Sequence, residues 1–217
     1  MRLSASEHES RPWRIREIAP DFKVEDVWAL PVDGRAEDFQ ELLDLALSSD
    51  PSHAESLPTR ILWNVRDRLG RWLDLGRVSA PAEAGRAGKL KLPIPGCEET
   101  SLAERLPQDL RGSASGLRFD SLPFIPLYRT DDEFAAELSN QTVHGVMHLA
   151  WVEQSDGRYQ GQMAVYVKPR GLLGEGYMAL IKPFRYLIVY PALMHQFERM
   201  WRARSGDSRT ASALPSS

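Results

Sequence analysis

Two histidines four residues apart, His144 and His148, are the side chains of this sequence best suited to chemistry. On a helix this spacing would let both imidazoles bind one metal ion, but residues 142–154 (TVHGVMHLAWVEQ) alternate as a β-strand does. Along a strand the two histidines lie about 13 Å apart, which is too far for both to reach a zinc ion at about 2 Å. No third ligand has a fitting spacing, so we predict no metal site and no cofactor.

A second strand must lie beside the first, because residues 158–169 (RYQGQMAVYVKP) also alternate and follow the turn signal Ser155-Asp156-Gly157. Directly opposed residues of an antiparallel pair share a face of the sheet. Matching the apolar faces places Trp151 opposite Met163 and Leu149 opposite Val165.

The other face of this hairpin is polar and holds the candidate catalytic residues His144, His148, Tyr166 and Lys168. The same alignment places His148 opposite Tyr166 and Lys168 opposite Val146. Two interpretations stay open. The face is the half-solvated outside of the sheet, or it lines a cavity in which a histidine with a pKa near neutral transfers protons and Tyr166 and Lys168 polarise the ligand.

Further side chains would line such a cavity if it exists, although core or surface is the more common role for residues of these types. Residues 131–140 are ambiguous, and we interpret them as a strand on which Glu133 and Glu137 share a face. Buried aromatic and basic residues on or beside the C-terminal helix would orient a polar group of the ligand. The ligand-binding candidates are Trp28, Glu137, Trp151, Met163, Tyr177, Arg185 and Tyr190.

The elements that must position these residues can be predicted in order along the chain. Residues 24–32 alternate as a strand, residues 36–47 and 57–75 have helical periodicity, and residues 76–100 form a long loop. Ser101 to Glu104 is the pattern of a capping box that begins a short helix limited by Pro107. Residues 123–130 predict one more strand.

The longest apolar-periodic run, residues 171–204, predicts a long C-terminal helix that bends at Pro183 and Pro191. We therefore expect an α+β fold in which a curved antiparallel sheet wraps around this helix. Residues 12–204 are expected to form a single domain. Residues 1–11 and 205–217 are expected to be disordered, because they contain few large apolar residues.

Composition excludes several functional classes. The net charge is −3, whereas a nucleic-acid-binding protein usually carries a basic surface, so we expect no nucleic-acid partner. The longest uncharged apolar run, residues 186–194, is shorter than the about 20 residues of a membrane span, so we expect a soluble protein. The single cysteine, Cys97, suits a reducing cytoplasm.

Three stretches resemble an uncharacterised bacterial family that is described only as a domain of unknown function. They are residues 26–31 (DVWALP), 142–149 (TVHGVMHL) and 163–194 (MAVYVKPRGLLGEGYMALIKPFRYLIVYPALM). The order of elements also resembles the helix-grip fold of the START-like superfamily, which includes the birch-pollen allergen type and the polyketide cyclases and aromatases. That resemblance implies a hydrophobic ligand cavity between the sheet and the C-terminal helix.

Three functional hypotheses follow. The first is a protein that binds a small hydrophobic molecule and performs cofactor-independent acid–base chemistry of the cyclase, dehydratase or isomerase type, with His148 or His144 as the acid or base. The second is a non-catalytic carrier or sensor of such a ligand. The third is a homodimeric interaction domain whose pocket is filled by Phe184, Trp28 and Trp151. The sequence leaves open whether the protein is an enzyme.

Overall fold

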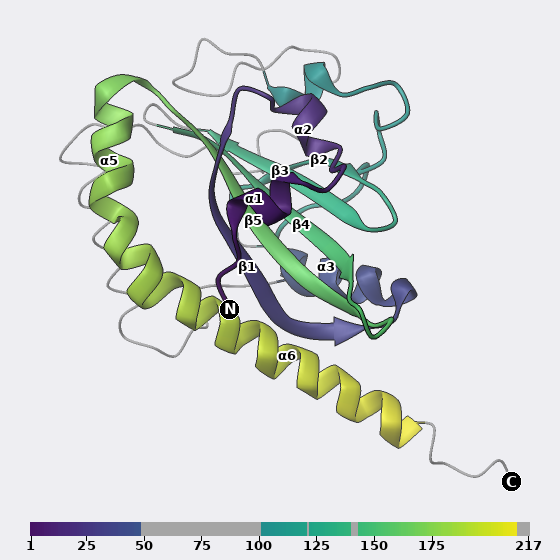
Figure 1. The fold of residues 1–217 in the computed structure, drawn as a ribbon. Helices are drawn as coiled ribbons and strands as arrows, with labels where there is room; N and C mark the ends of the chain where they lie inside the picture. The colour runs from purple at the N-terminus through teal and green to yellow at the C-terminus, as the bar shows by residue number, and fades with distance from the viewer. Residues whose placement is uncertain (49–100, 121, 140–142, 212–217) are drawn as a thin grey trace, which may run out of the picture.

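A five-stranded open antiparallel sheet in the order β1-β5-β4-β3-β2 forms the middle layer of the molecule (Figure 1). The computed structural model describes residues 1–48, 101–120, 122–139 and 143–211. The α+β class is confirmed, and so is the interpretation of residues 131–140 as a strand. The strands are β1 (Lys23–Gly34), β2 (Ile125–Arg129), β3 (Glu133–Ser139), β4 (Val143–Glu153) and β5 (Tyr159–Pro169).

The predicted β4–β5 hairpin forms, but its register differs by two residues from the predicted one. Leu149 pairs with Met163 and Trp151 with Gly161. A shift of two residues keeps every side chain on its face, so matching apolar faces does not distinguish the two registers. The turn does, because Gln154 N–H donates to the Arg158 carbonyl at 2.7 Å and Gly157 takes φ +80°.

The C-terminal helix and helix α3 (Phe39–Ser48), which follows a short 3₁₀ turn at Ala36–Asp38, pack against one face of the sheet. The long helix consists of α5 (Gly171–Phe184), a π-helical segment (Arg185–Val189) and α6 (Tyr190–Ala211). Pro191 has no N–H to donate to the carbonyl of Leu187, so the α-helical pattern cannot continue there, and a wider turn accommodates the gap. The core on this face includes Leu30, Leu42, Phe134, Leu149, Trp151, Phe197 and Trp201.

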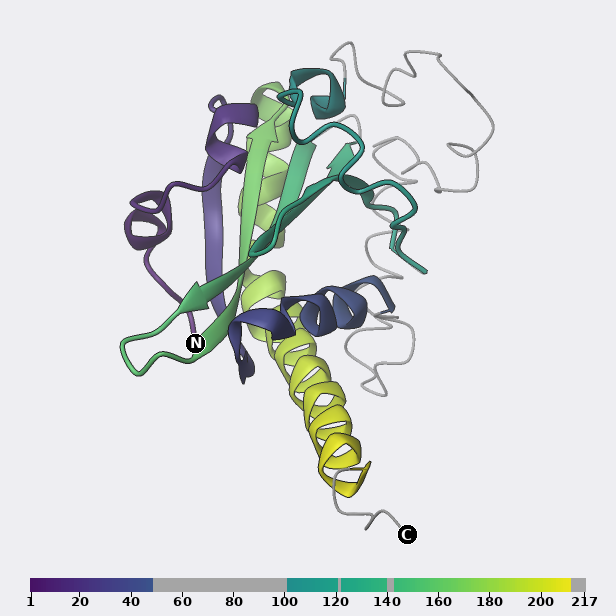
Figure 2. The same ribbon diagram turned by 90° about the vertical axis from the view of Figure 1, so that its right-hand side faces the viewer.

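The opposite face is covered by a layer that the sequence did not predict. The covering layer consists of α1 (Ala5–Glu9), α2 (Ile15–Ile18) and the 3₁₀ turn η4 (Leu102–Arg105). Figure 2 shows α1 and α2 on one side of the sheet and α3 on the other. Residues 1–11, which composition suggested would be disordered, are tied to β1 through Leu3 N–H to Val27 O at 2.9 Å and Ala29 N–H to Met1 O at 2.8 Å.

Some predictions fall outside the described residues. These are the helix over 57–75, the loop over 76–100 with Cys97, and the end of the tail, 212–217. Helix α6 continues to Ala211, into the first part of the tail that was expected to be disordered. The side chain of Tyr177 also lies outside the described part.

Candidate functional site

The polar face of β3 and β4 holds two buried glutamate–histidine pairs beneath the covering layer. His148 Nε2 lies 2.8 Å from Glu133 Oε2, and His144 Nε2 lies 2.9 Å from Glu137 Oε2. All four residues are at most 3 % exposed. The interpretation of this face as the half-solvated outside of the sheet is therefore wrong, and the face lies opposite the one on which the C-terminal helix packs.

The Glu133 carboxylate binds three groups at once. Besides His148 it lies 2.9 Å from the backbone nitrogen of Arg14, the N-cap residue of α2, and 3.0 Å from the hydroxyl of Tyr128. We assign the Nε2 proton of His148 as the donor in this pair, because Arg14 N–H and Tyr128 O–H already donate to the same carboxyl group. Glu133 thus stabilises the position of α2 against the sheet.

The Glu137 carboxylate has the same role for the other half of the covering layer. It accepts a hydrogen bond from the Ser101 hydroxyl and another from the Leu102 N–H at 3.1 Å, and Leu102 is the first residue of η4. Ser101 Oγ also accepts from Ala103 N–H at 3.1 Å, so the predicted cap forms, on a 3₁₀ turn. The ring of Phe22 packs edge-on against His144 with 4.9 Å between centroids.

His148 lies among three rings. The centroids of His8, Trp13 and Tyr166 are 5.3, 5.4 and 6.1 Å from that of His148. Burial, and then the charge that His148 can carry, lower the pKa of His8 to about 3, so His8 is neutral at neutral pH. Its Nε2 lies 3.0 Å from the Tyr166 hydroxyl, whose own pKa is raised by burial.

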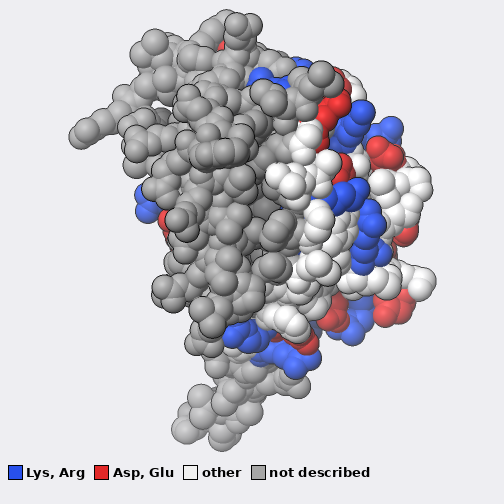
Figure 3. Space-filling model, turned by 90° about the vertical axis from the view of Figure 1, so that its left-hand side faces the viewer, with Lys and Arg blue, Asp and Glu red and all other residues white. Residues whose placement is uncertain are grey.

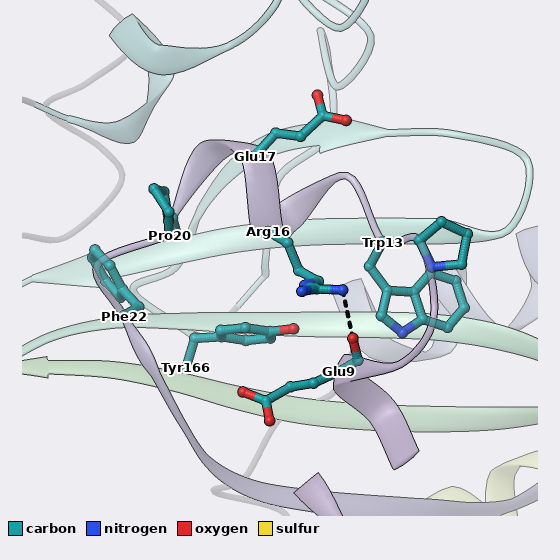
Figure 4. Close-up of a pocket in the computed structure, with 9 residues that line it drawn as sticks. Glu9, Trp13, Arg16, Glu17, Pro20, Phe22 and Tyr166 are labelled. Atoms are coloured by element: carbon teal, nitrogen blue, oxygen red, sulfur yellow. Dashed lines mark hydrogen bonds between the residues drawn. The ribbon is translucent and has the colours of Figure 1, made fainter. Parts of the chain in front are cut away.

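A pocket of about 440 Å³ opens above Tyr166 (Figure 4). Its buried lining is aromatic and apolar, while Glu9, Arg16 and Glu17 are exposed at its rim. In Figure 4 the Tyr166 hydroxyl and the Arg16 guanidinium point toward the space beside Trp13. Arg16 donates to the backbone carbonyl of Glu9 at 2.5 Å. The buried lining residues are Trp13, Ala19, Phe22 and Tyr166.

The two histidines differ in their second ring nitrogen. His148 Nδ1 is buried and has no hydrogen-bond partner among the described residues, and the same holds for Trp13 Nε1 beside it. His144 makes further interactions. An imidazole whose Nε2–H is held by a carboxylate has a lone pair on Nδ1, which is the form of histidine that accepts a proton. In that form His148 is a proton acceptor that is fully buried beneath Trp13.

A second hollow, of about 510 Å³, lies where the 3₁₀ turn before α3 approaches the β4–β5 turn. Its charged residues Arg35, Asp38 and Arg158 are not buried, and Arg158 forms an ion pair with Asp33. A site for proton transfer needs a group whose environment alters its chemistry. The pocket above Tyr166 meets that requirement better.

The predicted catalytic residues share a face, but they are not equally close to the pocket. Of the four, Tyr166 is the one that lines it, while His148 and His144 lie beneath Trp13 and Phe22. The predicted pairing of His148 with Tyr166 was wrong, since His148 pairs with Ala164, Tyr166 with Val146 and Lys168 with His144. Lys168 Nζ binds Asp21 at 3.0 Å near the surface.

Several ligand-binding candidates lie on the opposite face, around the buried carboxylate of Asp26. Tyr190 donates to Asp26 Oδ2 at 2.7 Å, Tyr186 donates to Oδ1, and Arg185 lies 3.1 Å from Oδ2. The ring of Trp28 packs on Tyr190 at 4.6 Å between centroids. These contacts stabilise the π-helical segment against β1.

The remaining candidates are part of the core or of the pairs described above. Trp151 and Met163 lie in the core beneath the C-terminal helix, and Trp151 Nε1 donates to the Arg35 carbonyl at 2.7 Å. Glu137 lies on the pocket side, in the pair with His144. Sequence reasoning missed His8, Trp13 and Arg16, which line or underlie the pocket. The only signal for them was a pair of aromatic residues, Trp13 and Phe22, at the end of a polar segment.

Two further features of the described residues bear on function. No group of three or more His, Cys, Asp or Glu side chains in that part of the chain could hold a metal ion. Within the same residues, no helix combines the length and apolar character needed to span a membrane. In the side of the molecule drawn in Figure 3, Lys and Arg are interspersed with Asp and Glu over the part of the surface that is described.

The chain belongs to a family described as "protein of unknown function (DUF2867)", which matches residues 18–192. No characterised protein in the curated comparison matches the sequence. No solved structure matches it either. Membership in this family therefore does not indicate a reaction, and the function must be argued from the geometry of the pocket and of the residues around it.

Proposed function

We propose that this protein binds a small, largely apolar molecule in the pocket above Tyr166 and performs cofactor-independent acid–base chemistry on it. One observation carries the proposal. The pocket has aromatic walls, and Tyr166 at its floor is hydrogen-bonded to the buried neutral His8. His148, which is paired with the Glu133 carboxylate, lies beside the ring of Trp13 in the pocket wall.

The dimensions and lining support a small ligand. A volume of about 440 Å³ lies in the range of small-molecule sites, which are mostly apolar with a few polar groups that fix orientation. Phe22 and Trp13 would stack on a planar ligand. Arg16 has guanidinium N–H groups left to bind a polar or anionic group of the ligand at the rim, since it donates only to backbone carbonyls among the described residues.

The proposed site lies on the face of the sheet opposite the C-terminal helix. It therefore differs in place from the cavity that a START-like helix-grip fold would imply. The long helix packed on an antiparallel sheet supports a START-like relationship as a proposal. We further propose a cytoplasmic location, which the single cysteine supports.

A non-catalytic carrier or sensor is the second candidate, and one observation favours it. Glu133 and Glu137 each bind the first residues of a short covering helix, so the two pairs already have a structural role. Buried polar networks of this kind are often conserved for the structure they specify. In that case the ligand would bind in the same pocket and be released without chemical change.

Dye binding tests the site. Anilinonaphthalene sulfonate is planar, apolar and anionic, and its fluorescence rises when it leaves water. We expect it to bind the full-length chain at one site. Replacing Arg16 with Ala should weaken binding about fivefold, as loss of one partly exposed charge-assisted hydrogen bond would.

The matched control is Arg35→Ala, because Arg35 is also an exposed arginine but lines the second hollow. Its loss should leave the dye affinity unchanged. Equal weakening by both variants, or weakening by Arg35→Ala alone, would contradict the proposal. Native mass spectrometry of freshly purified protein then separates the two candidates, because a carrier should retain an unaltered molecule.

A further inference from the structure

Trp13 separates the pocket from His148. One side of the indole lines the pocket, and the ring lies 5.4 Å from the imidazole of His148 between centroids. His148 is fully buried and Trp13 is 7 % exposed. Of the two pocket-lining rings beside His148, Trp13 and Tyr166, Trp13 is the nearer, and turning the indole away would open a path from the pocket to the histidine.

The closed position of the indole leaves two polar atoms unsatisfied. Among the described residues, neither Trp13 Nε1 nor His148 Nδ1 has a hydrogen-bond partner, and both atoms are buried. Burying a polar atom without a partner raises the free energy of that arrangement. The closed position is thus destabilised relative to one in which these atoms find partners in a ligand or in water.

The pair beneath the indole has the arrangement of a general base. His148 Nε2 lies 2.8 Å from Glu133 Oε2, and with the proton assigned to Nε2 the lone pair of the imidazole is on Nδ1. The carboxylate would also stabilise the positive charge of the imidazolium. Glu133 is itself held by Arg14 and Tyr128, so the orientation of the base does not depend on the ligand.

We propose that Trp13 is a gate between the pocket and His148, and that His148 Nδ1 removes a proton from the bound molecule when the indole turns away. The proposal rests on the proposed function, since it needs a ligand in the pocket above Tyr166. An acidic C–H or O–H bond of the ligand breaks, its electron pair stays on the ligand, and an N–H bond forms at Nδ1. Return of the same proton to another atom of the ligand completes an isomerisation without any other reactant.

His144 provides a matched control within the same protein. It is equally buried and is paired with Glu137 on the same face, but its cover is Phe22 and not Trp13. The experiment measures hydrogen–deuterium exchange at the C2 atom of each histidine in the full-length chain by peptide mass spectrometry. His195, whose side chain is 78 % exposed, gives the reference for free exchange.

The gate predicts a selective response. Replacing Trp13 with Ala should raise the exchange rate at His148 at least tenfold, which corresponds to about 1.4 kcal/mol, because the ring that covers the imidazole is removed, and should leave the exchange rate at His144 unchanged. Replacing Phe22 with Ala should raise the exchange rate at His144 and leave the exchange rate at His148 unchanged. Equal changes at both histidines would show that the covering layer opens as a unit, and no change at either would show that the indole does not control access. Both results would overturn the proposal.

The wild-type protein gives a second test that needs no variant. Turning one side chain exposes little surface, so exchange at His148 should be nearly independent of urea below the unfolding transition. Exchange at His144 should rise with urea, because it requires opening of a larger segment. Equal urea dependence at the two residues would refute the gate.

The results separate this proposal from the proposed function. Dye binding that is sensitive to Arg16, together with unselective histidine exchange, would leave the pocket as a binding site and exclude the gate. Selective exchange at His148 without dye binding would support the gate and exclude the proposed ligand class.

Discussion

The stability of this protein should fall in mild acid because of one histidine, His8. Its side chain is 2 % exposed and its pKa is lowered from 6.5 to about 3, first by burial and then by the neighbouring His148. The unfolded chain therefore binds a proton at pH values where the folded chain does not. Stability from His8 is present in full above pH 6.5 and is lost as the pH falls toward 3.

The magnitude follows from this difference. Between the two pKa values the unfolded state binds one more proton than the folded state, so the free energy of unfolding falls by about 1.4 kcal/mol per pH unit. From pH 6.5 to about pH 4.5 the loss amounts to about 2.7 kcal/mol, a large part of the 5–15 kcal/mol that typically stabilises a domain.

Urea unfolding at a series of pH values measures this loss. His8→Gln keeps a hydrogen-bonding side chain toward Tyr166 but does not titrate. The carboxylates are common to both proteins, so the difference between the two curves isolates His8. Parallel curves for wild type and His8→Gln between pH 6 and 4.5 would refute the reasoning. His195→Gln, at an exposed position, should leave the slope unchanged.

Three other substitutions test other contacts. Asp26→Asn should lower the free energy of unfolding in urea by about 3 kcal/mol, because Arg185 loses a buried partner; a loss below 1 kcal/mol would contradict this. Glu137→Gln should speed amide exchange at Leu102 about tenfold, because one hydrogen bond of the 3₁₀ turn is weakened, whereas unchanged exchange would mean that the turn is held otherwise. Gly161→Ala should cost about 1–3 kcal/mol in a thermal melt, since its Cβ would lie 2.6 Å from Val32 Cγ2; an unaltered Tm would show that the core can shift.

Periodicity was sufficient to predict the elements that have a clear apolar face. Helix α3, the β4–β5 hairpin and the long C-terminal helix all follow from the spacing of their apolar residues. Register did not follow, because the apolar faces of Trp151 and Met163 match in two alignments that differ by two residues. The π-helical segment was signalled only indirectly, by Pro183 and Pro191 on either side.

The covering layer could not be predicted because its contacts are long-range and polar. A polar strand face is usually solvated, and nothing local shows that His8 or Arg14 will lie on it. The sequence does contain one signal in retrospect. Glu133 and Glu137 are four residues apart on β3, and His144 and His148 are four apart on β4, so an antiparallel pairing of these strands forms both pairs at once.

Three buried carboxylates specify where the outer elements sit on the sheet. Asp26 binds the C-terminal helix through Tyr186 and Tyr190, Glu133 binds the start of α2, and Glu137 binds the start of η4. Apolar packing is not directional, so it brings a helix onto a sheet without fixing its position, whereas a carboxylate with several donors fixes it.

This common arrangement allows the surroundings of His148 to be compared with those of the other two carboxylate sites. A purely structural pair should leave no buried polar atom unsatisfied, because each such atom costs about 1–3 kcal/mol. The Asp26 carboxylate meets its donors on both oxygens, and His144 has further interactions beyond Glu137. Two of these groups retain a buried nitrogen without a partner in the described part of the chain, His148 at Nδ1 and Arg185 at Nε, and of the two only His148 lies beside a ring that lines the pocket. An unpartnered nitrogen is therefore not by itself a sign of chemistry, and the position of His148 beside Trp13 is what the histidine exchange experiment tests.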